Sequence, residues 1–240
     1  MKIYDYFARI YVIHLPERND RYVALDGELQ ALGIDLKGAK VRIPYAPRPS
    51  DANGFTSRAV YGNFLSHMGI MKEALQDRLP NVLILEDDAI FSRRMVKEQA
   101  ALVETLRSNV WDFCFFGHSL KRELKGCGKG LIPHRAGFIW AHCYAVNAGV
   151  LPKLVAYLEL TMTLPAGDPR GARMYIDGAL HMFRMQNPDV VTLVSNPVLS
   201  VQKGSDSSIA GRARYKSLPL IEPLIRIFRA ARDQFWRLTG

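Results

Sequence analysis

Three consecutive carboxylates, Glu86, Asp87 and Asp88, follow directly on the apolar run VLIL at residues 82–85. Such a short, continuous apolar run is typical of a central strand buried on both faces. Acidic side chains at the end of a buried strand cost desolvation and repulsion energy, and a bound cation is the simplest compensation. Because Mg²⁺ and Mn²⁺ prefer oxygen ligands and leave room for phosphate oxygens, the triplet predicts a divalent-metal site for a diphosphate.

Side chains alternate along a strand, so Glu86 and Asp88 would share one side if strand geometry persists through the triplet. Ligands of open α/β sheets bind outside the carboxyl ends of the strands, and the three acids lie at such an end. The alternative is structural: one or more of the acids caps the next segment or pairs with Arg93 or Arg94 at the surface.

Apolar runs and helical spacings alternate along the chain, and this alternation predicts an α/β fold. Residues 44–57 contain three prolines, Asn53 and Gly54, which predicts a long surface loop. A second loop is expected at 118–135, which is rich in Gly, Lys and Arg. The expected strands are 9–15, 82–85, 110–117, 138–146 and 190–195, and the expected helices are 21–32, 57–80, 93–107, 149–160 and 175–183.

The chain has 240 residues, of which 48% are hydrophobic, and this suits one globular catalytic domain, expected at 1–217. The three cysteines are odd in number and lack zinc-site spacing, so a reducing, cytoplasmic setting is expected. No segment has the length of a membrane span or the layout of a signal peptide. A formal charge of +9 indicates an anionic partner, and the lack of a nucleic-acid-binding motif favours a phosphorylated substrate or an anionic membrane.

The chain carries a series of motifs in a fixed order: IYVIHLPERNDR at 10–21, GNFLSHMGIMKEAL at 62–75, VLILEDDAIF at 82–91, AHCYAVN at 141–147, Asp177, and NPVLSVQKGSDSS at 196–208. Read together, these motifs resemble glycosyltransferase family 25, the lipooligosaccharide and collagen galactosyltransferase-like group, over residues 10–206. The resemblance implies a GT-A-like nucleotide-binding fold with a mostly parallel central sheet flanked by helices. It also implies a UDP-sugar donor, inversion at the anomeric carbon, and a metal–diphosphate held by the acidic triplet.

One stretch departs from the family pattern. Where family members commonly carry a Gly-Glu pair ahead of the helix motif, this chain has Ala59 and Val60 followed by Gly62-Asn63. Any role of that glutamate is therefore absent here or carried by another residue.

Two arginines after the first strand, Arg18 and Arg21, are assigned to the donor, because a GT-A fold places donor contacts there and guanidinium groups pair well with phosphate oxygens. The alternative is that both lie at a solvated helix start. Ser66, His67 and His142 are also expected to contact or orient the donor, with His142 a candidate for the acceptor too. For both histidines the alternative is a hydrogen-bonded packing residue.

An inverting transfer needs a carboxylate that takes the proton of the acceptor hydroxyl, and Asp177 is the expected catalytic base. It follows a Gly- and Pro-rich loop and matches an acidic position of the family; the alternative is a helix N-cap. Lys203, Ser205 and Asp206 match the family's late polar segment and are expected to bind donor or metal. The alternative is that these three residues lie in an ordinary flexible loop without a functional role.

Residues 218–240 combine apolar side chains with four arginines, which predicts a basic amphipathic helix. Such a helix suits the surface of an anionic membrane, where lipid-linked acceptors reside, or else packs on the core. The expected location is therefore cytoplasmic, with peripheral contact to the inner face of a bacterial inner membrane.

These observations predict a metal-assisted, inverting hexosyltransferase that uses a UDP-sugar, with galactose as the sugar considered first. The acceptor would be lipooligosaccharide, LPS or another cell-surface glycan. Two other classes stay open: a metal-dependent phosphotransferase or nuclease, and a non-enzymatic module that binds anionic surfaces.

Overall fold

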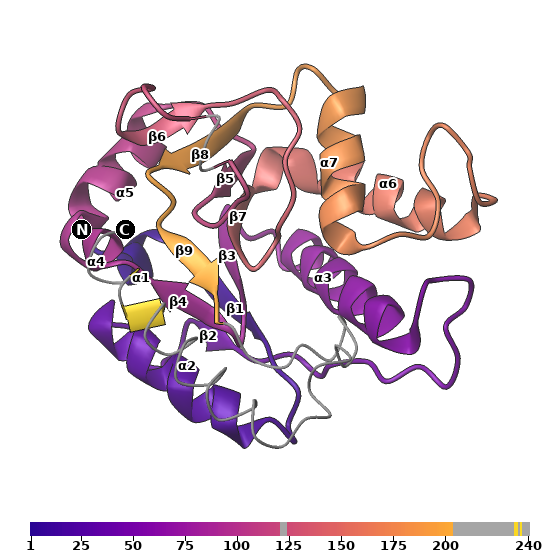
Figure 1. Cartoon of the computed structure of the whole chain (residues 1–240), viewed down its shortest axis with the longest axis horizontal. Coiled ribbons are helices and arrows are strands. Elements are labelled where there is room, and N and C mark those ends of the chain that lie inside the picture. Colours follow the sequence, from indigo (N-terminus) through magenta and orange to yellow (C-terminus); the bar gives the residue numbers. More distant parts are fainter. Residues whose placement is uncertain (121–123, 204–232, 235, 237–240) are drawn as a thin grey trace, which may run out of the picture.

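A seven-stranded sheet forms the centre of the molecule, with helices on both faces (Figure 1). The computed structural model describes residues 1–120, 124–203, 233–234 and 236. The strand order is β2-β1-β3-β7-β5-β8-β6. The strands are β1 (Arg9–Ile13), β2 (Val41–Arg42), β3 (Asn81–Glu86), β5 (Phe113–Phe115), β6 (Gly130–Pro133), β7 (Cys143–Asn147) and β8 (Thr192–Asn196).

Most strands of this sheet run in one direction. β1 pairs in parallel with both β2 and β3, and β5 pairs in parallel with β8. β7 lies antiparallel between β3 and β5, and β6 is antiparallel to β8 at the edge. The expectation of a mixed α/β fold with a mostly parallel, helix-flanked sheet is confirmed, and β1, β3, β5 and β8 end at the same edge.

The helices divide into two groups, one on each face of the sheet (Figure 1). One group is α3, α6 and α7, and the other is α1, α2, α4 and α5. The bounds are α1 (Ile3–Tyr6), α2 (Asn19–Ala31), α3 (Arg58–Gln76), α4 (Arg93–Lys97), α5 (Gln99–Ser108), α6 (Leu151–Thr163) and α7 (Ile176–Gln186), with a 3-10 turn at Ala148–Val150.

The longest helix, α3, begins at an N-cap that its sequence supplies. The Ser57 hydroxyl accepts a hydrogen bond of 3.2 Å from the Val60 amide, which satisfies one of the helix's free N–H groups. Its apolar residues recur three and four apart and are buried against the sheet, as Phe64 and Met71 illustrate. This anchoring fixes which α3 side chains reach the carboxyl end of β3.

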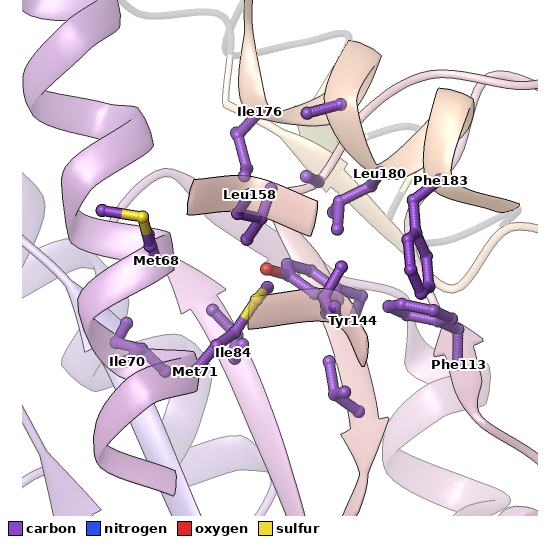
Figure 2. Packing of buried hydrophobic residues seen from close by; sticks show 14 of the residues in the cluster. Met68, Ile70, Met71, Ile84, Phe113, Tyr144, Leu158, Ile176, Leu180 and Phe183 are labelled. Atoms are coloured by element: carbon purple, nitrogen blue, oxygen red, sulfur yellow. The ribbon is translucent and has the colours of Figure 1, made fainter. Parts of the chain in front are cut away.

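Each face of the sheet packs its own apolar cluster. Figure 2 shows the cluster between the sheet and α3, α6 and α7, where Tyr144 of β7 lies among aliphatic and aromatic side chains. The Tyr144 phenol points from β7 toward α3. The residues labelled there are Met68, Ile70, Met71, Ile84, Phe113, Tyr144, Leu158, Ile176, Leu180 and Phe183.

A small second sheet closes the region beyond β3. It pairs β4 (Ala89–Phe91) antiparallel with β9 (Ser200–Gln202). Because Ala89 pairs with Gln202, residues 202–203 lie next to the acidic triplet. The Lys203 amide donates a 2.7 Å hydrogen bond to the Asp88 carbonyl.

Several sequence expectations need correction. The segment 118–135, expected to be a loop, contains β6, because Leu131 is buried at the sheet edge opposite β8. The expected helix 93–107 is two helices that meet at Glu98. The expected strand 138–146 begins only at Cys143, so His142 precedes it.

Two sets of expectations fall outside the described residues: those for Ser205 and Asp206, and nearly all of the C-terminal segment 218–240. Among the residues that the structure does describe, no helix has both the length and the apolar character needed to cross a membrane.

Candidate functional site

The acidic triplet lies where β3 ends. Glu86 is the last residue of β3, and Asp87 and Asp88 form the turn before β4, so strand alternation does not extend through the triplet. The Asp87 amide bonds to the Ile13 carbonyl at the end of β1, which ties the turn to the neighbouring strand.

Both carboxylate oxygens of Asp87 are already engaged. Its Oδ2 lies 2.8 Å from Nδ1 of His14, and its Oδ1 accepts a 2.8 Å hydrogen bond from Nη1 of Arg21. All three side chains are almost entirely buried. Asp87 is therefore fully engaged by His14 and Arg21, and it holds Arg21 against the turn.

Asp88 is held less completely than Asp87. Its Oδ2 lies 3.3 Å from Nη1 of Arg21, whereas its buried Oδ1 has no hydrogen-bond partner within the described part of the chain. Burial, followed by repulsion from Glu86, raises the pKa of Asp88 to about 7 against the attraction of Arg21. A buried carboxylate oxygen in this state is suited to a cation, which would satisfy it and favour ionisation.

Glu86 is fixed from three directions. Its Oε1 accepts a 3.0 Å hydrogen bond from Nδ2 of Asn63 and lies 3.4 Å from Nε2 of His67, and its Oε2 accepts a 3.1 Å bond from Nε2 of Gln202. Burial raises the pKa of Glu86, but hydrogen bonding and attraction by His67, together with Asn63, outweigh it and leave the pKa lowered. These contacts therefore favour the ionised form of Glu86.

His67 connects Glu86 to the core. An ionised carboxylate only accepts hydrogen bonds, so Nε2 of His67 carries the proton. The other ring nitrogen, Nδ1, lies 2.8 Å from the hydroxyl of Tyr144. Asn63 and His67 are four residues apart on α3, so they occupy one face of the helix and reach the same oxygen of Glu86.

His142 is buried beside this group. Neither ring nitrogen has a hydrogen-bond partner among the residues described, and burial lowers the pKa of His142 to about 4 against the attraction of Glu86. The ring packs directly over Gly117, where a Cβ atom would lie 2.2 Å from Nε2. Because Gly117 has no side chain, the neutral His142 ring can occupy this position beside the acidic site.

A cavity of about 450 Å³ adjoins the acidic turn. Its walls are Ile13 and Leu15 after β1, Pro47 and Pro49 from the long loop, and the first half of α3, including Asn63. Because the Asn63 amide also binds Glu86, a ligand that fills this cavity ends beside the carboxylates.

The other predicted donor residues are distributed around this cavity and turn. Ser66 lines the cavity, although its hydroxyl donates to the Gly62 carbonyl at 2.9 Å. Arg18 precedes α2 and pairs with Asp20, while Arg21, one turn later, reaches the acidic turn instead. Lys203 touches the turn through its backbone and has an exposed side chain.

Asp177 lies in the first turn of α7, which packs away from α2 and the acidic turn. Its Oδ2 accepts a 3.3 Å hydrogen bond from the Trp140 amide, and its Oδ1 accepts one of 2.9 Å from Gly178. The N-cap position belongs to Tyr175, so Asp177 is not the cap. Trp140 in turn lies with its ring centroid 6.1 Å from that of His142. Asp177 is thus joined to the site through the loop before β7.

The residues present fit a divalent cation with an incomplete protein shell. In the described ranges, no three His, Cys, Asp or Glu side chains are grouped as a full ligand set. Of the three acids, Asp88 keeps an unpaired Oδ1, and a cation at Glu86 would take the place of the Gln202 amide at Oε2. Mg²⁺ and similar ions are commonly held by one or two carboxylates plus substrate phosphates, so this donor set suits a metal that arrives with a diphosphate.

Three residues with direct contacts to the acids were not assigned a role from sequence: His14, Asn63 and Gln202. Tyr144, which contacts His67, was not assigned one either. A signal existed for His14, because it directly follows a strand parallel to β3 and must lie at the same sheet edge. For Asn63 the signal was its spacing of four from His67. Gln202 depended on the β4–β9 pairing, which the sequence pattern did not reveal.

Comparison with protein families relates the chain to a glycosyltransferase family. Residues 48–166 match the family model described as glycosyltransferase family 25 (LPS biosynthesis protein). The matched segment contains α3, the acidic triplet and β7, which are the elements that build the site. Just under half of the chain therefore matches glycosyltransferase family 25.

Similar proteins include procollagen galactosyltransferase 2 of Homo sapiens and of Mus musculus, at 25% identity over 207 residues and 24% over 213. Each alignment covers 76% of this chain and 31% of the relative, so the chain spans about a third of their length. Among solved structures, one similar chain is a glycosyltransferase involved in the glycosylation of the major capsid of PBCV-1. It has 12% identity and a TM-score of 0.41, and the match covers 95% of this chain and 97% of that one.

Proposed function

We propose that this chain is an inverting hexosyltransferase that takes its sugar from a UDP-sugar donor. The observation that carries the proposal is the shared position of Asn63, which lines the 450 Å³ cavity and donates a hydrogen bond to Glu86. A nucleoside in the cavity would place its diphosphate at the acidic turn. Sugar and acceptor would then meet beyond it, near His142.

Glu86 and Asp88 are the proposed metal-binding residues. A divalent ion bound there would supply charge neutralisation for the departing nucleoside diphosphate. Glu86 is kept ionised and oriented by Asn63, His67 and Gln202, and Asp88 presents a buried, unpaired oxygen. Asp87 positions the turn through His14 and Arg21, since both of its oxygens are engaged there.

The cavity walls suit a nucleoside. Apolar surfaces from Ile13, Pro47 and Pro49 can cover the faces of a base and ribose, while Arg48 and Arg58 supply guanidinium groups on the lining. Arg48 pairs with Glu17, which also lines the cavity. The cavity therefore offers a donor both charged side chains and apolar surfaces.

Asp177 is the proposed base. It takes the proton of the acceptor hydroxyl while that oxygen attacks the anomeric carbon, and the bond from this carbon to the diphosphate breaks with its electron pair leaving on the diphosphate. Its link to Trp140, beside His142, supports a position on the acceptor side of the site. The mixed polar and aromatic character of this side suits a sugar hydroxyl as nucleophile.

The sugar and acceptor follow from the relatives' names. The curated relatives are named galactosyltransferases, and the family description names LPS biosynthesis. We therefore propose galactose as the transferred hexose and a cell-surface glycan, such as a lipooligosaccharide, as acceptor. A cytoplasmic location with peripheral contact to an anionic membrane remains part of the proposal, to be checked by cell fractionation.

A nucleotide-sugar panel tests this function. UDP-galactose, UDP-glucose, UDP-N-acetylglucosamine and GDP-mannose are each added with and without Mn²⁺, and both melting temperature and released nucleoside diphosphate are measured. The proposal expects one UDP-sugar and Mn²⁺ to stabilise the fold more together than separately, with slow UDP release. Phosphoryl transfer or nucleic-acid cleavage without any response to UDP-sugars would favour a phosphotransferase or nuclease instead.

A further inference from the structure

Arg184 is a buried cation far from the acidic turn. It lies near the end of α7, and only 4% of its surface is exposed. The flat face of its guanidinium stacks over Phe138, 4.1 Å from the ring centroid, and also faces Phe115 at 5.7 Å. This stacking leaves the edge of the guanidinium, where its N–H groups point, for hydrogen bonding.

Two edge donors of Arg184 bind neutral oxygens. Nε donates to the Thr192 hydroxyl at 2.9 Å, and Nη2 donates to the Ala136 carbonyl at 3.2 Å. Nη1 makes no hydrogen bond to any residue in the described ranges. The guanidinium thus keeps an open donor in the plane with which arginine binds oxyanions.

Among the described side chains, no carboxylate forms an ion pair with Arg184 or compensates its charge. Burial lowers the pKa of Arg184 to about 10. A buried charge without a counter-ion is destabilising, because it has lost its hydration without gaining an opposite charge. The contact with the Phe138 ring offsets only part of this cost.

A small cavity of about 120 Å³ opens beside Arg184. A second cation, Arg135, and the hydroxyl-bearing Thr192 line it, and none of its lining residues in the described ranges is Asp or Glu. Since the cavity proposed for the donor is about 450 Å³, this one suits a small ion and not a nucleotide. Its size and its charge therefore point to the same kind of occupant.

We propose that this cavity is a binding site for a small inorganic oxyanion, with phosphate or sulfate as the chemical class. Arg184 would donate from Nη1, Arg135 would reach the anion from the cavity's exposed side, and Thr192, whose oxygen accepts from Arg184, would donate its own hydroxyl proton. The bound anion supplies the counter-charge that the described fold lacks at Arg184.

This site is separate from the donor site. Thr192 begins β8 and Pro133 ends the antiparallel β6, so the cavity lies at the amino end of β8. β1 and β3 end at the opposite edge, where the acidic triplet lies. The proposal is therefore independent of the sugar-transfer reaction, and a failure of one leaves the other standing.

Anion-dependent melting tests the site. Melting temperature is measured in sodium phosphate and sodium sulfate against sodium chloride at equal ionic strength, without Mn²⁺ or nucleotide. We expect a saturable rise with phosphate and sulfate that chloride does not give. In Arg135→Ala, whose side chain is exposed, the apparent Kd for phosphate should weaken about tenfold, as expected for loss of one charge-assisted hydrogen bond.

Two further variants secure the test. Arg107→Ala removes an exposed arginine of α5 and should leave the phosphate response unchanged. Arg184→Lys keeps the charge but loses the planar fork, and should weaken the response at least as much as Arg135→Ala. Equal stabilisation by chloride, or wild-type phosphate affinity in Arg135→Ala, overturns the proposal, because an anion at the donor site would not depend on Arg135.

Discussion

Nδ2 of Asn63 donates a 3.0 Å hydrogen bond to Oε1 of Glu86, and this contact joins the nucleotide-sized cavity to the acidic turn. Asn63 stands in the stretch where this chain departs from the family's Gly-Glu pattern. Its amide is a donor, so it favours the ionised form of Glu86, whereas a second acid at the same place would repel it.

Replacement of Asn63 by alanine should reduce turnover without unfolding the protein. A hydrogen bond to a charged group contributes about 1.5 to 3 kcal/mol, so kcat/KM for the donor should fall roughly 10- to 100-fold. Asn63→Asp should be worse, because it adds a negative charge beside Glu86. UDP release and melting temperature are measured together; activity in Asn63→Asp equal to wild type would contradict the role given to this amide.

Arg21 should matter more for stability than Arg18. Arg21→Met removes the cation shared by Asp87 and Asp88, leaving buried charges uncompensated at a cost of about 3 to 5 kcal/mol of unfolding free energy. Arg18→Met is the matched control: its partner Asp20 is exposed, so the cost should stay below about 1 kcal/mol. Urea unfolding measures both, and similar losses in the two variants would rule out this account.

The raised pKa of Asp88 predicts a pH-dependent stability of the metal-free protein. The folded pKa of about 7 exceeds the ordinary value of 3.8, so the protonated form favours folding. This contribution is fully present below pH 3.8 and is lost as the pH rises through 7, by as much as about 4 kcal/mol. Asp88→Asn lacks this loss.

The measurement compares wild type with Asp88→Asn by urea unfolding in the presence of a chelator. The stability of Asp88→Asn relative to wild type should increase from pH 4 to pH 7 and then level off. A difference that stays constant over this range would show that Asp88 titrates normally. Added Mn²⁺ with UDP should restore wild-type stability above pH 7 but leave Asp88→Asn unaffected.

Gly117 should not tolerate a side chain. A Cβ atom there would lie 2.2 Å from Nε2 of His142 and 3.0 Å from the Ser200 carbonyl, so Gly117→Ala must displace the buried imidazole. We expect both stability and donor turnover to fall. Gly69→Ala is the control, because its Cβ meets nothing within 4 Å in α3 and should stabilise the helix by about 0.5 to 1 kcal/mol. Unchanged activity in Gly117→Ala would reject the importance of His142's position.

Sequence periodicity was sufficient for the elements that bury one continuous face. β1, β3 and α3 were predicted near their observed bounds, because their apolar spacing reports burial directly. β4, β6 and β9 were not predicted, since each is short and gains its strand character from a partner distant in the chain. The site residues on β3 and α3 could therefore be predicted from sequence, whereas Gln202, which β9 brings to Glu86, could not.

The acids were found from sequence, but their division of labour was not. Adjacent carboxylates look alike in a sequence, and only the fold shows that Asp87 faces His14 and Arg21 while Asp88 keeps an unpaired oxygen. Arg184 is a similar case. Its sequence context is that of an ordinary helical arginine, and only the fold shows that it is buried and lies over the Phe138 ring. Tertiary packing, which leaves no local pattern, decided both cases.

Anomalous diffraction from crystals grown with Mn²⁺ and UDP would locate the metal and the donor nucleotide. We expect a manganese peak within bonding distance of carboxylate oxygens of Glu86 and Asp88, with the UDP diphosphate on the same ion and the uridine between Pro47 and α3. A manganese peak elsewhere, with Glu86 and Asp88 keeping only their protein contacts, would contradict this expectation.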